Sequence, residues 1–160
     1  MPVIIRPIEQ QDNQAMATII RSVFEELDLP KTGSSYADPE IDAMFEQFAD
    51  VSGGYFIAEE NSQFLGGCGI FPTEGLPVGC AELIKLYLSP IGRGRGIGRK
   101  LIEASVILAK QLKYQYLYLD SFPELTDAIR LYKKMGWQQI GQPLGKSGHS
   151  SCTIWLLREL

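Results

Sequence analysis

Apolar residues recur at two different spacings along this chain, and each spacing predicts one kind of element. Short apolar and β-branched runs predict strands, at residues 3–6, 55–59, 64–71, 80–88, 116–120, 137–140 and 151–157. Apolar residues three or four positions apart predict helices, over 12–27, 39–49, 97–112 and 125–135. The resulting order, β-α-α-β-β-β-α-β-α-β-β, predicts an α/β domain that combines a hairpin with one strand–helix–strand crossover.

A glycine-rich segment joins the strand at 80–88 to the helix that follows it. It reads GRGRGIG over residues 92–98, and in this position backbone N–H groups converge on an anion. Neither of two common phosphate-binding motifs, GxxxxGK(S/T) and GxGxxG, fits the segment. Basic residues here oppose the macrodipole of the helix, at a cost of a few tenths to about 1 kcal/mol each. The pattern predicts a site for a polyanion, with a solvated turn as the alternative. The basic residues are Arg93, Arg95, Arg99 and Lys100.

Composition and charge narrow the class of protein. With 160 residues, of which 45% are hydrophobic and 21% charged, the chain fits a single domain over 1–160 that buries a full core. A net charge of −4 argues against a broad face for nucleic acid or anionic membrane, but it leaves room for a local anion site. There is no apolar run long enough to cross a membrane, and the N-terminus lacks the pattern of a signal peptide. We therefore expect a cytoplasmic protein that binds neither nucleic acid nor membrane.

The three cysteines, Cys68, Cys80 and Cys152, are odd in number and far apart. A disulfide framework needs an even count, and a metal site built on cysteine typically uses close pairs. We therefore expect buried thiols in a reducing compartment and no metal site.

The segment 86–98 resembles the acyl-CoA-binding motif of the GNAT superfamily of N-acetyltransferases. That motif, Gln/Arg-x-x-Gly-x-Gly/Ala after a strand, is matched by Arg93, Gly96 and Gly98. A second signature of the family, a helix with Ala-x-x-x-Tyr that ends in glycine and an aromatic residue, is similar to residues 128–137. The resemblance covers essentially the whole chain. It implies the GNAT-type α/β fold, a mixed central sheet of about seven strands flanked by about four helices.

The resemblance implies that acetyl-CoA is the co-substrate and assigns residues to it. Backbone amides of the loop hold the pyrophosphate, and two neighbouring strands part beyond Leu88 to admit the pantetheine arm. Main-chain groups of Leu86 and Leu88 then pair with that arm, and one of their N–H groups polarises the thioester carbonyl. Leu125 stands where many members carry asparagine, which leaves that pantetheine contact open. The implied acetyl-CoA-binding residues are Leu86, Leu88, Arg93, Gly94, Arg95, Gly96, Ile97 and Gly98.

Acetyl transfer to an amine needs a base and an acid. The acceptor arrives as an ammonium ion with a pKa of about 10 and must lose a proton, whereas the departing thiolate must gain one. Tyr132 occupies the position of the family's tyrosine near the CoA sulfur, so the resemblance implies that it is the acid. A tyrosine that only packs in the core is the alternative.

Glu82 is the candidate base, because it is similar to a glutamate that histone-acetylating members of the family use. Alternation along the strand is expected to place Glu82 on the same apolar face as Ile84, Leu86 and Leu88, which would raise the pKa of its carboxyl group. A structural pair with Lys85 or with a neighbouring strand is the alternative. His149, the only histidine, and a water molecule are further candidates for the base.

The acceptor pocket of this family is built from the first two helices and the loop between them. Carboxylates in that region favour a cationic acceptor, although a solvated helix face explains them equally well. Asp120, which ends a strand, is a further candidate contact with the acceptor. The carboxylates are those of Glu25, Glu26, Asp28, Asp38, Glu40 and Asp42.

Together with the resemblance, the sequence predicts an enzyme that transfers the acetyl group of acetyl-CoA to the primary amine of a small molecule. Attack is expected to be direct, because no cysteine is placed with a histidine base. One alternative is a protein or peptide amine as the acceptor, and another is a non-catalytic CoA-binding sensor. A homodimer is left open.

Overall fold

A computed structural model describes residues 2–160, whose strands form one sheet in the order β1-β2-β3-β4-β5-β7-β6. The strands are β1 (Ile4–Pro7), β2 (Gly54–Glu60), β3 (Gln63–Phe71), β4 (Cys80–Leu88), β5 (Tyr116–Ser121), β6 (Gln138–Ile140) and β7 (Ile154–Glu159). The helices are α1 (Asn13–Glu26), α2 (Met44–Ala49), α3 (Ile97–Gln111) and α4 (Thr126–Lys134). Neighbouring strands are antiparallel except β4 and β5, which are parallel. The predicted α/β class, mixed sheet and order of elements are confirmed.

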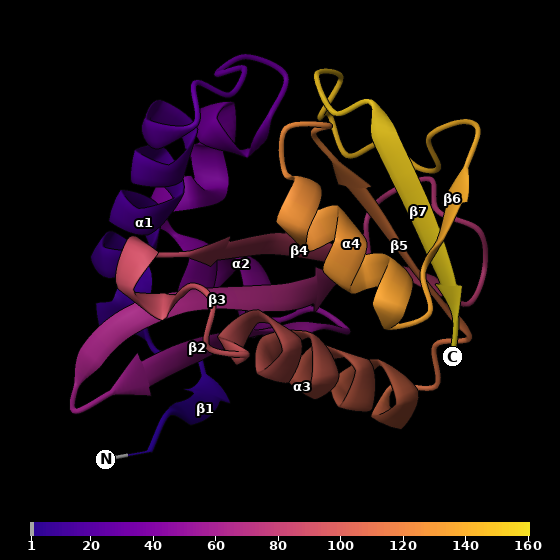
Figure 1. Cartoon of the computed structure of the whole chain (residues 1–160). Helices are drawn as coiled ribbons and strands as arrows, with labels where there is room; N and C mark the ends of the chain where they lie inside the picture. The colour runs from indigo at the N-terminus through magenta and orange to yellow at the C-terminus, as the bar shows by residue number, and fades with distance from the viewer. Residues whose placement is uncertain (1) are drawn as a thin grey trace.

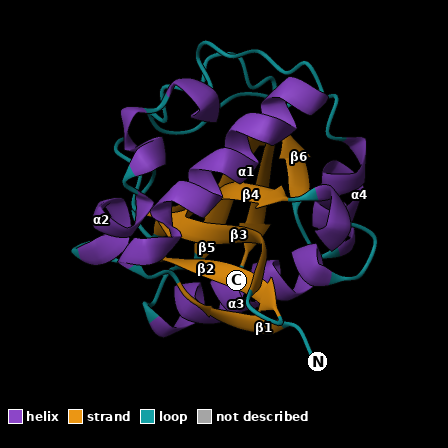
Figure 2. Cartoon of the chain, turned by 90° about the vertical axis from the view of Figure 1, so that its left-hand side faces the viewer, coloured by secondary structure: helices purple, strands orange, loops and turns teal. Residues whose placement is uncertain are grey.

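Helices cover both faces of the sheet (Figure 1, Figure 2). Phe24 of α1 and Met44 of α2 belong to one buried cluster, which includes Ile57 of β2. Leu101 of α3 belongs to a second buried cluster, which includes Ala58 of β2. Because consecutive strand residues point to opposite faces, the two clusters lie on opposite sides of the sheet. We call these sides the α1 face and the α3 face.

The helix predicted over 39–49 is two short pieces. A 3₁₀ helix covers Pro39–Asp42, and Ala43 then leaves the helical region with φ −137° and ψ 45°. The side chain of Asn13 accepts a hydrogen bond from Phe45 N at 2.8 Å, so a residue of α1 caps the start of α2. This cap comes from a distant part of the chain, so local sequence does not reveal it.

Cys68, Cys80 and Cys152 are buried free thiols, as predicted. β7 begins and ends a few residues later than the strand predicted at 151–157. Within residues 2–160, every helix is too short or too polar to cross a bilayer.

Candidate active site

The central feature of the sheet is the place where β4 and β5 part. The two strands pair only over residues 80–82 of β4, while β5 stays paired with β7 as far as Ser121. In Figure 1, β5 and β7 run in a clearly different direction from β2, β3 and β4. The resemblance predicted that the strands part beyond Leu88. In the structure they part earlier, after Glu82. The parting leaves the 83–88 edge of β4 without a strand partner on the β5 side among the described residues.

A β-bulge at Lys85 reverses the faces of the sheet to which the side chains of the second half of β4 point. Lys85 has φ 55°, and β4 has one residue more than β3 across this irregularity. Ile84 packs in the cluster of the α1 face, but Leu86 and Leu88 pack in the cluster of the α3 face. The expectation that Glu82 shares a face with these two leucines is therefore wrong. The bulge sends the leucines to the α3 face and leaves Glu82 and Lys85 on the α1 face.

Main-chain groups of Leu86 and Leu88 face the opening between β4 and β5. On the β3 side, Ser89 N donates to Leu65 O at 2.8 Å, and successive backbone groups alternate in direction. The backbone N–H and C=O groups of Leu88 and Leu86 therefore point away from β3, into the opening. Arg93 confirms this direction for Leu88, because its Nε and Nη2 donate to Leu88 O from that side at 3.3 and 3.1 Å. An extended ligand on this edge can pair with the backbone once Arg93 gives way.

A groove of about 520 Å³ lies between the end of β4, the glycine loop and the start of α4. Gly94 and Gly96 have φ of 71° and 77°, and a Cβ at either position would meet nothing within 4 Å. Only glycine adopts such angles without strain, and the bare backbone lets a phosphate approach closely. Since α3 begins at Ile97, its first N–H groups have no partner within the helix. Of the predicted acetyl-CoA residues, all but Arg95 line this groove.

Most of the basic residues around the loop form ion pairs with carboxylates of the same chain. The pairs are Arg93–Glu26 at 2.7 Å, Arg95–Glu60 at 2.6 Å and Arg99–Glu103 at 3.2 Å. Partly exposed pairs of this kind are weak, so a ligand can displace them. We therefore expect anion binding at this loop to depend more on its backbone geometry than on the positive charge that the sequence suggested.

A smaller polar cavity of about 40 Å³ adjoins the groove. The groove and the cavity share Leu86, Tyr87 and Leu125 in their walls, so they meet where β4 and β5 part. A space of this size takes an ammonium group and about one or two water molecules. Its polar lining consists of Ser35, Glu82, Lys85, Asp120, Ser121, His149 and Cys152.

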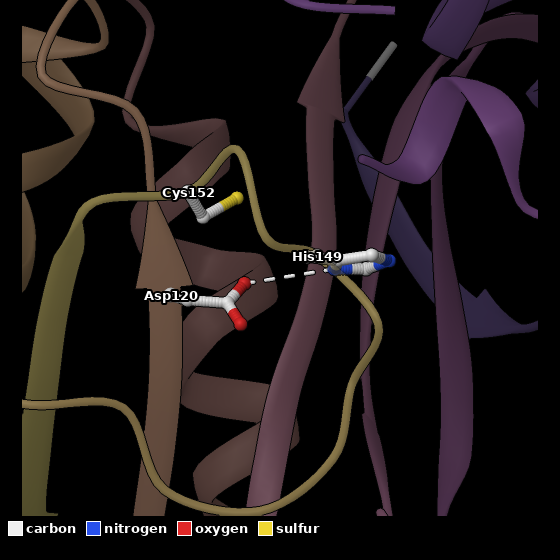
Figure 3. Close-up of side chains that lie close together, drawn as sticks. All are labelled: Asp120, His149 and Cys152. Carbon is white, nitrogen blue, oxygen red and sulfur yellow. Dashed lines mark ion pairs between the residues drawn. The ribbon is translucent and has the colours of Figure 1, made fainter. Parts of the chain in front are cut away.

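Buried charges around the cavity join segments that are far apart in the sequence. Asp38 Oδ2, between α1 and α2, accepts hydrogen bonds from Lys85 Nζ at 2.7 Å and from His149 Nε2 at 2.8 Å. His149 Nδ1 lies 3.6 Å from Asp120 Oδ1 (Figure 3). Burial lowers the pKa of His149, but the carboxylates of Asp120 and Asp38 outweigh it and raise the pKa to about 9. The imidazole is therefore a cation near neutral pH, which disfavours His149 as the base.

Glu82 has the acid–base properties that a general base requires. It is 2% exposed, and its Oε1 accepts a hydrogen bond from Thr73 Oγ1 at 2.5 Å. Burial raises its pKa to about 7, the negative charge of Asp120 adds to the rise, and the nearby cations oppose it. Of the structural alternatives, the pair with Lys85 is wrong, since Lys85 pairs with Asp38. The contact with a neighbouring strand is made by Thr73, just beyond the end of β3. A carboxylate that titrates near neutral pH can take a proton from an ammonium ion.

Tyr132 lies in the core of the α3 face. It is 7% exposed, and its ring centre is 5.7 Å from that of Trp137. Its side chain lines neither the groove nor the cavity. Burial raises the pKa of its phenol well above the ordinary value, so the phenol carries its proton at neutral pH. This meets one requirement of an acid, while contact with the CoA sulfur stays a prediction.

The structure brings a cysteine and the histidine together, contrary to expectation. Potential ligand atoms of Asp120, His149 and Cys152 all lie within 4.8 Å of one another (Figure 3). Burial and the negative charge of Asp120 raise the pKa of the Cys152 thiol well above its ordinary value. A thiol of this kind is not activated as a nucleophile. Direct attack was expected because no cysteine was predicted to lie near a histidine. The structure supports the same expectation for another reason, which is that the Cys152 thiol is not activated.

Sequence reasoning missed much of the cavity wall. Of the carboxylates suggested for the acceptor pocket, Asp38 lies behind the cavity wall, where it forms ion pairs with the wall residues Lys85 and His149. Glu26 and Asp42 instead form ion pairs near the surface. A signal for Lys85 was present, because a lysine in the interior of a largely apolar strand needs a buried partner. The identity of that partner depends on the tertiary fold.

Comparison with known proteins agrees with this geometry. The model of the "Acetyltransferase (GNAT) family" matches residues 20–137. An "Uncharacterized N-acetyltransferase YjgM" of Escherichia coli (strain K12) is 34% identical over 158 residues, which are 98% of this chain and 95% of that protein. A GNAT-family acetyltransferase of Staphylococcus aureus Mu50 has a TM-score of 0.89 at 17% identity, over 99% of each chain. The structure of yncA from Salmonella typhimurium with acetyl-CoA has a TM-score of 0.77 at 18% identity, over 100% of this chain and 94% of that one.

The family model covers most of the chain, and the Escherichia coli relative covers nearly all of it. The glycine loop and the parted strands place the groove where the family's motif lies in the sequence. This chain therefore belongs to the GNAT family of acetyltransferases, and it is an acetyl-CoA-dependent acyltransferase rather than a non-catalytic CoA-binding sensor.

Proposed function

We propose that the protein acetylates the primary amine of a small molecule by direct attack of that amine on acetyl-CoA. The observation that carries this proposal is the junction of groove and cavity at Leu86, Tyr87 and Leu125. Acetyl-CoA that lies along the free edge of β4 would bring its thioester to this junction. An amine in the polar cavity would then reach the carbonyl carbon from the other side.

Each proton transfer has a candidate group. Glu82 takes a proton from the ammonium group, because only the neutral amine has a lone pair that can form a bond to the carbonyl carbon. The second N–H proton, which becomes acidic once that bond forms, leaves to solvent. A main-chain N–H of Leu86 or Leu88 donates to the oxygen that gains negative charge. The carbon–sulfur bond then breaks, and Tyr132 gives its proton to the thiolate. Tyr132 regains a proton from solvent and Glu82 loses its proton to solvent before the next turnover. The products are the acetylated amine and CoA.

The cavity supports a cationic amine carried on a slender arm. Glu82 and Asp120 place carboxyl groups in its wall, and its volume of about 40 Å³ takes only the amine end of an acceptor. Lys85 and His149 supply positive charge on the same wall, and the Asp38 carboxylate contacts both. When Glu82 is deprotonated, the carboxylates of Glu82, Asp38 and Asp120 outnumber these two cations by one, and this excess of negative charge attracts the ammonium group.

A panel of acceptors tests the proposal. Acetyl-CoA and the purified protein are mixed with alkylamines, polyamines, amino acids and lysine-containing peptides, and free CoA thiol is measured. We expect at least one small primary amine to release CoA and to appear as its acetylated product by mass spectrometry. The corresponding tertiary amine, which has no N–H to lose, should give no product. Acetylation of peptides alone would contradict the proposal and establish the protein-amine alternative.

A further inference from the structure

We propose that Asp120, His149 and Cys152 form a binding site for a divalent cation of the zinc type in the wall of the acceptor cavity. Asp120 is in β5, and the other two residues belong to the loop before β7. In Figure 3 the carboxylate and the thiol project side by side toward the histidine. Carboxylate oxygen, imidazole nitrogen and thiolate sulfur are the ligand atoms that zinc prefers in proteins.

Distances within this cluster suit tetrahedral coordination after a small adjustment. His149 Nδ1 and Asp120 Oδ1 are 3.6 Å apart, which is too long for a hydrogen bond. Two ligands on one tetrahedral zinc, with bonds of about 2.1 Å, are separated by about 3.4 Å. All three ligand atoms lie within 4.8 Å of one another, so the widest pair must approach by about 1 Å. Rotation of side chains on a loop can supply that movement.

Asp38 supplies a second and independent indication of a metal site. A histidine that binds a metal through one ring nitrogen usually donates the N–H of the other to a carboxylate, which fixes the ring. His149 Nε2 donates to Asp38 Oδ2 at 2.8 Å. Lys85 Nζ holds the same carboxylate at 2.7 Å. This arrangement leaves Nδ1 of His149 as the nitrogen that faces Asp120 and Cys152.

The ligand set also matches a dication in charge. A carboxylate, a thiolate and a neutral imidazole around a cation of charge +2 sum to zero, so the bound cluster buries no net charge. Binding releases to solvent the proton of the thiol and any proton on Nδ1. The dication stabilises the thiolate that it binds.

Metal at this site would compete with the acceptor. The cation and the ammonium group would both bind the Asp120 carboxylate, and the cluster lines the cavity. A zinc-type cation is thus expected to inhibit acetyl transfer reversibly. This consequence rests on the proposed function, whereas the metal site itself does not.

Cobalt(II) provides a direct test, because it replaces zinc in tetrahedral sites and reports a thiolate ligand by charge-transfer absorption. Co²⁺ is titrated into the full chain after removal of metals with EDTA. We expect saturation at about one equivalent per chain, a thiolate-to-cobalt band, and loss of that band when Zn²⁺ is added. Cys152→Ser should abolish the band. Cys80→Ser removes another buried thiol, outside the cluster, and should keep it.

Absence of the band in the native protein, or an equal band in Cys152→Ser, would overturn the proposal. If the Cys152→Ser variant does not fold, thiol alkylation of the native protein decides. Cys80 and Cys152 are 6% and 7% exposed, so they are comparable without metal. Zn²⁺ should slow the alkylation of Cys152 alone, and equal or absent protection would contradict the site. Neither measurement uses acetyl-CoA or an acceptor, so failure of the proposed function leaves both results interpretable.

Discussion

The groove and the cavity meet at one opening, yet they are made of different parts of the polypeptide. The groove is largely backbone, because Gly94 and Gly96 expose main-chain N–H groups and the free edge of β4 continues the surface. The cavity is largely side chain, and its charges come from β4, β5 and two loops. We therefore expect binding of acetyl-CoA to depend on a short contiguous segment of the chain. Acceptor recognition is expected instead to depend on residues that only the tertiary fold brings together.

The largest effect is expected where the cavity depends on one buried carboxylate. Asp38→Asn leaves the ammonium of Lys85, which is 2% exposed, without its counter-charge. An unpaired buried charge of this kind lowers the free energy of unfolding by about 3 kcal/mol or more, which chemical denaturation measures. The double variant Asp38→Asn/Lys85→Met should recover most of the loss, because it buries no ammonium.

Asp42→Asn is the control for this comparison. Asp42 lies close to Asp38 in the sequence, but its pair with Arg21 is exposed. Its replacement should change the free energy of unfolding little. Equal destabilisation by the two substitutions would show that the Asp38 carboxylate does not act as a buried counter-charge.

The next effect concerns the proton that the thiolate receives. Tyr132→Phe keeps the ring that packs on Trp137 and removes only the hydroxyl. If Tyr132 is the acid, the single-turnover rate should fall by roughly 10²-fold, with acetyl-CoA affinity unchanged. Tyr114→Phe is the control, because its hydroxyl donates to Ser52 O, outside the groove and the cavity. An unchanged rate with a stability loss of about 1 kcal/mol would identify Tyr132 as structural.

A smaller effect is expected from the backbone of the groove. Gly96 and Gly79 have φ of 77° and 81°, so Gly96→Ala and Gly79→Ala introduce similar strain of about 1 kcal/mol. Only Gly96 lines the groove. Gly96→Ala should therefore weaken CoA binding by about tenfold, or about 1.4 kcal/mol, measured by calorimetry. If Gly79→Ala weakens binding as much, the effect is strain and not contact.

Features that depend on neighbouring residues in the sequence, such as the groove, could be predicted, whereas features that depend on the tertiary fold, such as the cavity, could not. Apolar periodicity was sufficient for the order of strands and helices, because each helix buries one face in one of two clusters and the central strands contribute to both clusters. The glycine loop was visible because its function depends on residues that are adjacent in the sequence. The bulge at Lys85 was not visible, and it overturned the assignment of Leu86 and Leu88 to one face with Glu82. A bulge adds one residue to a strand without changing its composition.

The sequence also could not reveal which distant residues contact each other in the buried cavity wall. Asp38 could be named as one carboxylate among several, but its contacts with Lys85 and His149 join positions 47 and 111 residues away. Cys152 was expected to be only a buried thiol, yet it lies beside His149 and Asp120. Such clusters depend on the crossing of loops over the sheet, which local patterns do not encode.

One measurement tests the role of Glu82 in direct attack. Single-turnover acetyl transfer to the best amine of the panel is followed against pH, in the presence of EDTA, for the native protein, Glu82→Gln and Glu124→Gln. A base must be deprotonated to act, and the pKa of Glu82 is raised to about 7, so the native rate should rise with pH through about 7 and then level off. Glu82→Gln should bind acetyl-CoA normally, react at least about 10²-fold more slowly and lose this inflection. Glu124→Gln, which alters the groove but not the cavity, should keep it. A Glu82→Gln variant with the native rate and the same inflection would contradict the role of Glu82 as the base.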